Sequence, residues 1–399
     1  MANTITAFTP AYWAKEMQVV FFKECVALGL ANTELRDVLS NGDVVHKPYR
    51  SYLAAQTYSK NTDISTFNDL TATDETLTVD TAKVVPFYVD DLDKIQNKWD
   101  TASRFAQDSQ KVLNNVLDQA VLAEYSNART FISSQDLGGS GTGAVAITQA
   151  NISNMFAVAA RKLEAADVPT NDLVAVVGPR LMETLKLYVG GRETGFGETV
   201  SDNGKIARRF GFDIYQSNNI PFSALITYGA TTNNPSNLDT FTLNGVVFTF
   251  VSSIGSTAGN ILIETNATDT MTNLVNEIND ATANAAKRIA ISSSDRKKLR
   301  KMGVVATNST TTFTLTGYGD VALAESASNF AITNNIQYPV FMMRGAIDLL
   351  VQKSPSVEFR VAEKRLGRYV YPWMLYGKKT FDSMKDAMTY CKVDTSSWV

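Results

Sequence analysis

The chain has 399 residues, a formal net charge of −3, 44% hydrophobic residues and 19% charged residues. This composition is typical of a globular protein, and the length allows about two or three domains. Lysine and arginine are spread along the chain without a basic tail or stripe, which argues against specific nucleic-acid binding because phosphate neutralisation needs clustered cations.

Two further features bear on the compartment of the protein. The first residues lack the basic and apolar regions of a signal peptide, and no window approaches the ~20 apolar residues of a membrane span. The cysteines, Cys25 and Cys391, stand near opposite ends of the chain, which gives no disulfide framework and suits a reducing cytoplasm. We expect both to be buried as small hydrophobic side chains.

Two helices are expected within residues 1–42. Thr9 and Pro10 supply a capping hydroxyl and a proline at the first helical position. Apolar residues then recur on one face as far as Leu28, and Gly29 ends the pattern. A shorter helical segment is expected over 32–42. This N-terminal part is apolar enough to need a partner surface.

The period of the apolar pattern changes within residues 43–131. Extended segments are predicted over 43–52 and 75–89, and the polar stretch between them is expected to project as a hairpin loop. From residue 90 to 131 the apolar residues recur mostly at three- and four-residue steps, which predicts a helix ~60 Å long. A helix of this length is longer than one compact core is wide. We therefore expect a spine that carries other elements, and a loop that reaches a neighbouring subunit.

The rest of the chain is predicted to mix helices and strands in an α+β pattern. A helix is expected over 147–167, a buried strand over 173–178, and a further helix that starts at Pro179. Residues 230–333 are rich in Thr, Asn and Ser and are expected to form an inserted domain, with a hairpin turn at Asn244–Gly245. Strand-rich, aromatic segments follow and are expected to pack back onto the body.

The residue types argue against an enzyme. His46 is the only histidine, so a multi-histidine metal site is excluded and any triad would have to use this residue. It lies in an alternating strand pattern, where a partly buried structural position is expected. The glycine-rich stretches 137–143 and 190–205 lack the spacing of phosphate-binding loops. We therefore expect no catalytic residue, no cofactor and no metal.

The order of the segments resembles that of a known family. An N-terminal arm precedes GDVVHKP, an extended loop, and the run DETLTVDTAKVVPFYVDDLDKIQ that leads into the long helix. LVAVVGPRLMETL, GKIARRFGFDIYQSNNIP and YGKKTFDSMKDAMTYCKV follow in that order. In this order and spacing the chain resembles the major capsid protein of tailed double-stranded DNA bacteriophages, the Hong Kong 97-like fold, apart from about 230–333.

The resemblance implies an α+β fold with defined parts. These are an N-terminal arm (1–42), an extended loop (43–89), a spine helix with part of the peripheral domain (90–149), an axial domain (150–229 and 334–345), an inserted β-rich α/β module (230–333), and the C-terminal part of the peripheral domain (346–399). The resemblance further implies a structural protein that assembles as hexamers and pentamers into an icosahedral shell of the virion, in the cytoplasm of the bacterial host.

The partners implied by the resemblance are copies of the chain itself, packaged double-stranded DNA contacted non-specifically, a portal, a decoration protein on the outer module, and no membrane. A separate scaffolding protein is expected because no acidic scaffolding segment precedes the arm. The candidate contacts between subunits are Trp13, Phe21, Lys60, Phe67, Lys83, Arg192 and Phe196. Lys60 and Lys83 lie in the loop region where one branch of the family carries a crosslinking lysine, but no motif supports that bond and none is expected.

Two other structural classes remain open. An encapsulin-like nanocage shares the fold and would enclose cargo protein, although the insertion and the long arm favour a virus. A flagellin-like or tail-like surface polymer is suggested by residues 230–333 alone. Such polymers usually have long coiled-coil ends, which this sequence lacks.

Overall fold

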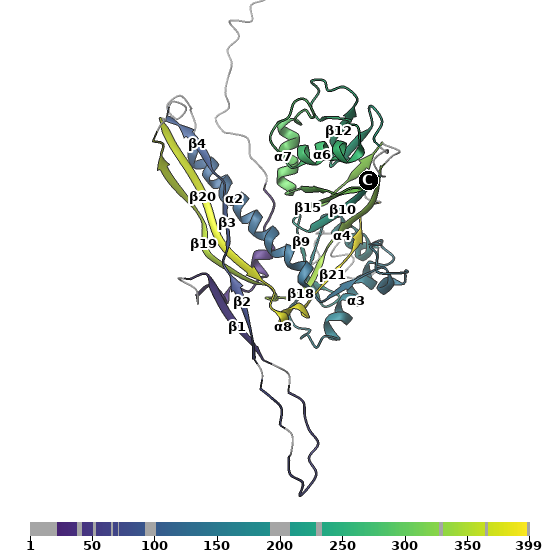
Figure 1. Ribbon diagram of the computed structural model, residues 1–399. Helices are drawn as coiled ribbons and strands as arrows, with labels where there is room; N and C mark the ends of the chain where they lie inside the picture. Colours follow the sequence, from purple (N-terminus) through teal and green to yellow (C-terminus); the bar gives the residue numbers. More distant parts are fainter. Residues whose placement is uncertain are drawn as a thin grey trace, which may run out of the picture.

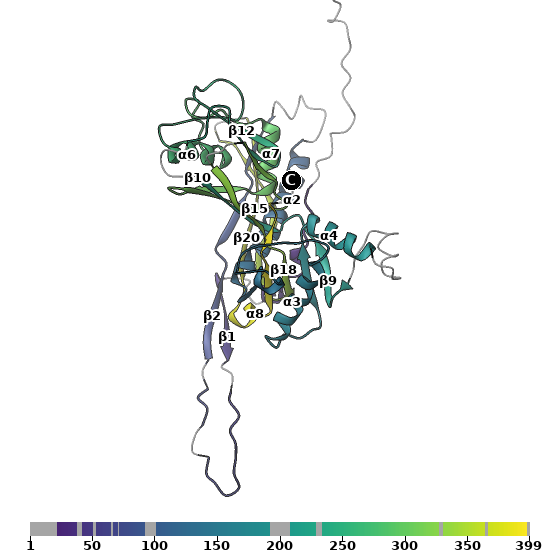
Figure 2. The ribbon, with the colours of Figure 1, turned by 90° about the vertical axis from the view of Figure 1, so that its right-hand side faces the viewer.

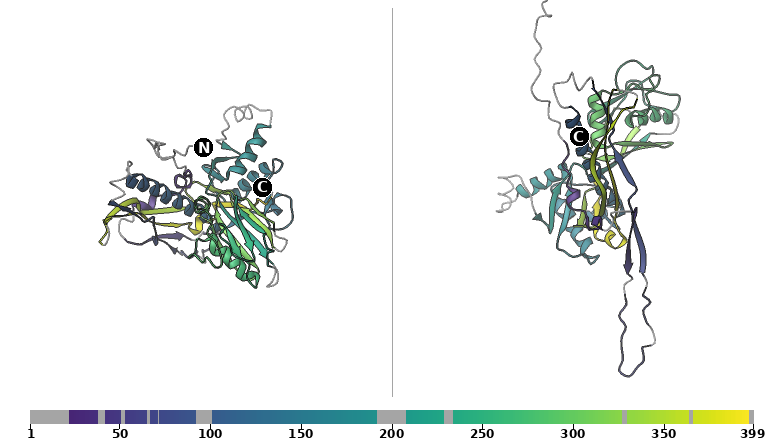
Figure 3. Two further views of the ribbon diagram at one scale, coloured as in Figure 1. Left: turned by 90° about the horizontal axis from the view of Figure 1, so that it is seen from above. Right: turned by 90° about the vertical axis from the view of Figure 1, so that its left-hand side faces the viewer.

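The computed structural model has an α+β architecture with two lobes side by side and one long projecting loop (Figures 1 and 3). One lobe is built on helix α2 (Thr101–Leu122) and strands β19 (Asp348–Val361) and β20 (Gly367–Lys379). The other lobe holds most of the remaining sheets. The structure describes residues 22–37, 42–50, 53–64, 67–70, 72–91, 101–191, 208–228, 234–326, 330–363 and 366–396.

A six-stranded sheet forms the centre of the second lobe. Its strands, in order, are β5 (Thr130–Ile132), β21 (Met388–Cys391), β18 (Val340–Met343), β7 (Leu173–Val177), β9 (Phe212–Gln216) and β8 (Arg208–Arg209). Strand β7 is buried along its whole length, with β18 and β9 paired to its two edges. The buried strand predicted from the sequence is therefore confirmed. Helices α3 (Ile152–Glu164) and α4 (Pro179–Gly190) contribute buried side chains to the same hydrophobic core as this sheet.

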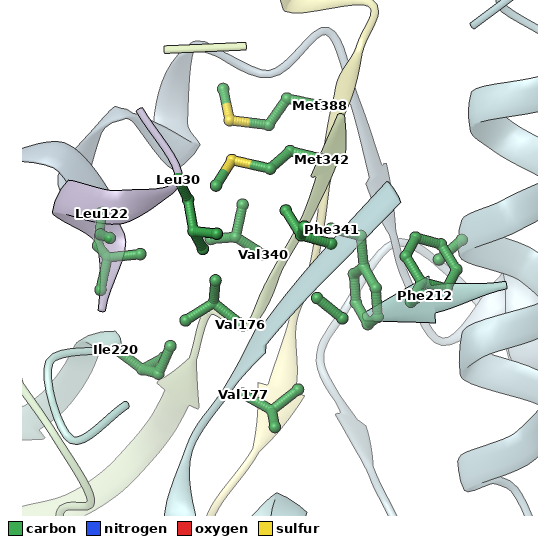
Figure 4. Close-up of a cluster of buried hydrophobic side chains, with 14 of the residues drawn as sticks. Leu30, Leu122, Val176, Val177, Phe212, Ile220, Val340, Phe341, Met342 and Met388 are labelled. Atoms are coloured by element: carbon green, nitrogen blue, oxygen red, sulfur yellow. The ribbon is translucent and has the colours of Figure 1, made fainter. Parts of the chain in front are cut away.

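Both faces of this sheet are covered by apolar side chains (Figure 4). Successive residues of a strand point to opposite faces, so Phe341 and Val340 of β18 enter different layers. Phe341 faces α3, where its ring meets that of Phe156 edge-on with 5.3 Å between centroids. Val340 lies on the side of Leu30 and Leu122 (Figure 4). The N-terminal segment and α2 thus close the face that α3 leaves open.

A second hydrophobic core fills the outer end of the molecule, opposite the projecting loop (Figure 2). It draws on buried residues from Phe222 to Leu323. The expected turn at Asn244–Gly245 is confirmed, because both residues have positive φ (48° and 76°) between two antiparallel strands. The elements are, in one sheet, β14 (Val305–Asn308), β15 (Thr312–Tyr318), β10 (Pro221–Tyr228), β17 (Phe330–Gln337), β22 (Val393–Asp394) and β6 (Val145–Ala146); in the other, β13 (Asn260–Leu262), β12 (Val246–Val251), β11 (Thr240–Leu243) and β16 (Leu323–Glu325); and helices α6 (Ala267–Ile278) and α7 (Ser293–Met302).

Helix α2 lies along the β19–β20 hairpin as a spine (Figure 1). It ends at Leu122, so the prediction of a helix as far as residue 131 was wrong. A 3-10 turn (Ala123–Asn127) follows because the buried Glu124 accepts a hydrogen bond from Thr380 at 3.2 Å and pairs with Lys378 at 2.9 Å. These contacts from β20 and its following residue turn the chain away from the helix axis and into β5.

The N-terminal segment is also less helical than its apolar pattern predicted. Within the described residues 22–37, residues 22–26 have no regular structure and 3-10 turns form at Ala27–Gly29 and Glu34–Asp37. The helix predicted as far as Leu28 is therefore wrong in the part that the structure describes. The cause is Asp118 of α2, whose carboxylate accepts a hydrogen bond from the Ala27 N–H at 2.7 Å. This side chain takes the place of the carbonyl that a helix would offer.

Gly377 of β20 allows a close approach by strand β2 (Ala72–Thr78). A Cβ at this position would lie 2.3 Å from the carbonyl oxygen of Thr78. Because overpacking typically costs about 1–3 kcal/mol, Gly377→Ala is expected to lower the free energy of unfolding by about 2 kcal/mol in urea titrations. Gly143→Ala is the matched control, since its methyl group would meet nothing within 4 Å. Equal stability of the two variants would contradict this packing.

Candidate assembly surfaces

The loop between β1 (Val44–Arg50) and β2 projects furthest from the body (Figure 1). Every described residue over 53–64 and 67–70 is exposed and lacks regular secondary structure. A turn at 59–62 reverses the chain, with a hydrogen bond of 3.2 Å from the Thr62 N–H to the Ser59 carbonyl. Nearer the body, the Asn68 amide donates to the Ala54 carbonyl at 2.7 Å. The two sides of the loop therefore stay close to each other.

Large apolar side chains are exposed along both sides of this loop. Single exposed apolar residues are ordinary on a protein surface, whereas several of them exposed together on one projecting loop indicate a surface for contact with another molecule. The residues and their exposed fractions are Leu53 (50%), Tyr58 (65%), Ile64 (55%), Phe67 (78%) and Leu70 (84%). We name these five side chains the loop row.

The base of the loop is fixed to the body by a small separate core. Strands β1 and β2 form an antiparallel ribbon in which Val45 lies opposite Leu77. Both side chains are buried against Leu350 of β19 and Phe381, which follows β20. Burial along β1 and β2 decreases toward the loop. The ribbon therefore holds a fixed direction at its base and presents the loop row away from the body.

Asp348 is the ionic anchor of this base. It is only 1% exposed, and its carboxylate accepts hydrogen bonds from Lys47 at 3.1 Å and from Asn32 at 2.8 Å. Burial raises the pKa of Asp348, and the hydrogen bond from Lys47 opposes that rise. The Lys47 ammonium also lies 4.6 Å from the centre of the Phe381 ring. One carboxylate therefore joins the loop, the N-terminal segment and β19.

Lys47→Met is expected to lower the free energy of unfolding by about 2 kcal/mol near neutral pH, because it leaves a buried carboxylate without its cation. Loss of Lys47 should raise the pKa of Asp348 further. Since the folded state then binds a proton more readily than the unfolded chain, the deficit should shrink as pH falls from about 7 toward about 4. Urea titrations across this pH range measure the loss of unfolding free energy. Lys60→Met at the exposed tip is the control. If both variants lose the same free energy at every pH, the ion pair of Lys47 with Asp348 does not anchor the loop.

A second apolar surface lies at the far end of the β19–β20 hairpin. Phe359, Val361 and Leu366 are 55%, 76% and 72% exposed. A groove of about 550 Å³ runs between this end of the hairpin and α2. Its apolar walls are formed by Val89, Ala106, Val357, Phe359 and Val370. The described chain therefore presents exposed apolar surface both on its loop and on its spine lobe.

Strand β3 (Thr81–Val84) forms another part of the spine lobe, where it pairs with β20; β4 (Phe87–Asp90) pairs with the same strand nearer the hairpin end. Lys83 is exposed on β3 and lines a cavity of about 290 Å³ together with Trp373 and Glu358. The Trp373 indole donates to Glu358 at 2.7 Å, and the Lys353 ammonium lies 4.0 Å from the indole ring centre. This polar cluster is fixed in place and accessible.

Histidine, cysteine and acidic residues are the groups that could hold a metal ion. In the part of the chain that the structure describes, no three His, Cys, Asp or Glu residues are placed to hold a metal ion. His46 is exposed and pairs with Asp74 at 2.5 Å, so its expected partly buried position is wrong. Cys391 is buried as expected, whereas Cys25 is only half-buried, and burial raises the pKa of its thiol to about 11. Among the described helices, none is both long and apolar enough to span a membrane.

The structure places some of the candidate contact residues. Lys60 lies in the exposed turn at the loop tip, Phe67 belongs to the loop row, and Lys83 is exposed on β3. Their role in subunit contact stays a prediction. Trp13, Phe21, Arg192 and Phe196 lie outside the described residues.

Sequence reasoning did not identify the Asp348 anchor, Asp118, or the exposed end of the hairpin. A weak signal existed for the two acids. Asp348 stands within the apolar run GAIDLLV, and Asp118 follows Leu117 on the apolar side of the long helix. A charged residue at such a position requires a buried partner.

Solved structures share this arrangement along nearly the whole chain. The capsid structure of the cyanophage P-SCSP1u matches with a TM-score of 0.58 at 15% identity, covering 98% of this chain and 95% of that one. A Mycobacterium phage Che8 structure matches with a TM-score of 0.57 at 14% identity over 96% and 97%. The mature capsid of bacteriophage PhiM1 matches with a TM-score of 0.53 at 11% identity over 96% and 92%. No protein-family model and no curated protein matches the sequence.

These likenesses concern the fold, because the identities are low. They confirm the expected α+β class and the resemblance to capsid proteins of bacteriophages. Coverage of both chains is nearly complete in each case, so the shared fold includes the spine lobe, the central sheet and the outer sheets together.

Proposed function

We propose that this chain is the major capsid protein of a tailed double-stranded DNA bacteriophage and that copies of it form an icosahedral shell around the packaged genome. The observation that carries the proposal is the loop row, exposed on a fixed ribbon, in a chain with the fold of phage capsid structures. A monomer gains nothing from such a row, whereas a subunit that repeats under symmetry buries it against its neighbour.

The mechanism combines a rigid spine lobe with a reaching loop. Helix α2 and the long hairpin provide a fixed frame, and the anchored base gives the loop its direction. The loop row supplies apolar area, and the extended backbone beside it can add hydrogen bonds along a neighbour's strand. Each contact can be weak because every subunit repeats it many times. Bending of the irregular loop beyond this base would let the same contact serve hexamers and pentamers.

The remaining partners follow from the shell. A separate scaffolding protein would guide closure, a portal would occupy one vertex, and the module over 230–333 would face outward, where a decoration protein could bind. The formal net charge of −3 favours only weak, non-specific and salt-sensitive contact with the DNA inside. The site of action would be the virion, after assembly in the host cytoplasm.

Electron microscopy of the purified protein, expressed alone and with a candidate scaffolding protein, tests the proposal. Closed particles on the order of tens of nanometres across are expected because many copies must surround a genome. Particles that contain cargo protein and no DNA after expression in the native host would point to a nanocage. Small discrete oligomers under both conditions would contradict the shell.

A further inference from the structure

The first described residues run along helix α2 toward its C-terminal end. The Lys111 ammonium lies 4.9 Å from the centre of the Phe22 ring. Further along the chain, the Ala27 N–H donates to the Asp118 carboxylate at 2.7 Å. Because Lys111 precedes Asp118 in the helix, the segment and α2 run in the same direction. The chain before Phe22 is therefore directed toward the N-terminal half of α2.

The groove of about 550 Å³ between α2 and the end of the β19–β20 hairpin lies on this path. The side of the groove that α2 forms extends from Ser103 to Gln110 and includes Gln107. Gln107, Lys111 and Asp118 follow one another at steps of four and seven residues, so they share one face of the helix. The face that contacts the N-terminal segment therefore continues into the groove.

The opposite side of the groove is apolar and only partly covered by the described residues. Phe359 of β19 lines the groove and is 55% exposed. Val357 and Val370 extend the same apolar side. A partly exposed apolar groove beside a helix is the kind of surface that accepts the apolar face of another helix.

Residues 10–21 carry the side chains that such a groove accepts. Trp13, Met17, Val20 and Phe21 stand at positions i, i+4, i+7 and i+8, which places them on one face of a helix. A helix over this range would be ~18 Å long, and the side of the groove that α2 forms is ~11 Å long at the same rise. The segment is therefore long enough to span the groove from its attachment on α2.

We propose that residues 10–21 dock as an amphipathic helix in the groove of their own subunit, with their apolar face toward Phe359. The direct connection to Phe22 keeps the segment at a high effective concentration beside the groove, which favours it over a second copy of the chain. The docked segment completes the apolar core of the spine lobe. This assigns Trp13 and Phe21 to contacts within one subunit.

The reactivity of a cysteine in the groove tests the proposal in unassembled protein. Ser103→Cys places a thiol on the α2 side of the groove, and peptide mass spectrometry follows its labelling by a maleimide separately from Cys25 and Cys391. Removal of residues 2–17 is expected to raise this labelling rate about tenfold, because the groove loses its cover. Ser126→Cys is the matched control, since Ser126 is an exposed serine outside the groove. An unchanged rate at position 103, or an equal rise at both positions, would overturn the proposal.

Single substitutions in the full-length chain identify the face that docks. Trp13→Ala and Met17→Ala should each raise the labelling rate of Ser103→Cys about fivefold, because each removes apolar area from the docked face. Lys15→Ala is the matched control, since position 15 lies on the other side of that helix. Trp13→Phe should keep most of the protection. If Lys15→Ala raises the rate as much as Trp13→Ala does, the proposed face does not dock in the groove.

Protein concentration distinguishes the attached segment from a second copy of the chain. Protection by the segment of the same subunit should be equal at every protein concentration. If the loop row of another subunit covers the groove instead, protection increases with concentration and disappears on deletion of residues 56–72. That result would overturn the proposal for residues 10–21 without contradicting the shell. Failure of the protein to form shells, in turn, leaves the labelling result unchanged.

Discussion

Deletion of residues 56–72 is expected to abolish closed shells while the protein still folds. The deletion removes four members of the loop row, namely Tyr58, Ile64, Phe67 and Leu70. Without them a subunit has neither the reach nor the apolar area to engage its neighbour through this loop. Because shell closure multiplies one contact many times, loss of that contact should reduce particle yield by about 100-fold or more.

The folded state should survive because the anchored base remains. Residues 44–49 still pair with 73–78, and residues 50–55 are long enough to connect them as a hairpin loop. The buried pair of Val45 and Leu77 and the ion pair of Lys47 with Asp348 are untouched. The free energy of unfolding should therefore stay within about 1 kcal/mol of the parent value. Urea titration of the unassembled protein measures this.

A second variant distinguishes the contribution of the loop's length from that of its apolar side chains. Replacing residues 56–70 by a Gly- and Ser-rich segment of equal length keeps the span and removes the same four members of the loop row. If the loop row supplies the attraction, this variant fails to form particles as fully as the deletion does. If backbone reach suffices, it recovers particles. Normal shells from the deletion itself, counted by electron microscopy beside the parent, would refute the proposed role of the loop.

Local patterns in the sequence predicted the elements whose structure depends on near neighbours. The Asn244–Gly245 turn follows from two residues that tolerate positive φ. The buried strand at 173–177 follows from an unbroken apolar run, and α4 follows from Pro179 at its first position. The projecting loop was predictable too, since a polar stretch between two strands has no core to bury.

The predictions that were wrong concern features that depend on contacts between residues distant in the sequence. The apolar period continued through Ala128, but the contacts of Glu124 with Lys378 and Thr380 end the helix earlier. No local pattern contains that information. The end of the β19–β20 hairpin shows the converse limit, because Phe359 carries the same apolar signal as a core residue and only its place in three dimensions reveals its exposure. Contact sites between subunits share the composition of cores, so sequence alone cannot separate them.

Asp118→Ala is expected to cause the largest loss of stability among the single substitutions considered, about 3 kcal/mol in the free energy of unfolding. The carboxylate is fully buried and accepts hydrogen bonds from the Ala27 N–H and the Asn219 amide. Its removal leaves two buried donors without acceptors, each at about 1–3 kcal/mol. Burial raises the pKa of Asp118, so relief of a buried charge offsets part of that loss.

Asp118→Asn separates the hydrogen bonds from the charge. An asparagine oxygen can still accept from the Ala27 N–H, but its amide nitrogen would face the Asn219 amide nitrogen, which also donates to Asn115 at 2.8 Å. Asn219 cannot turn its amide without losing the hydrogen bond that its oxygen accepts from Gln119 at 3.3 Å. We therefore expect an intermediate loss of about 1–2 kcal/mol, measured by urea titration beside the alanine variant.

The same variants test whether Asp118 holds the N-terminal segment. Limited proteolysis should cleave near residues 22–30 faster in Asp118→Ala than in the parent, because the segment then loses its hydrogen bond to α2 and keeps the apolar contacts of Leu30 and the hydrogen bond from the Gly345 N–H to the Leu30 carbonyl. Asp108→Ala is the matched control on the same helix, where the carboxylate is partly exposed and pairs with Lys111 at 3.7 Å. It should leave cleavage and stability within about 0.5 kcal/mol of the parent. If both alanine variants behave alike, apolar packing rather than the carboxylate docks the segment.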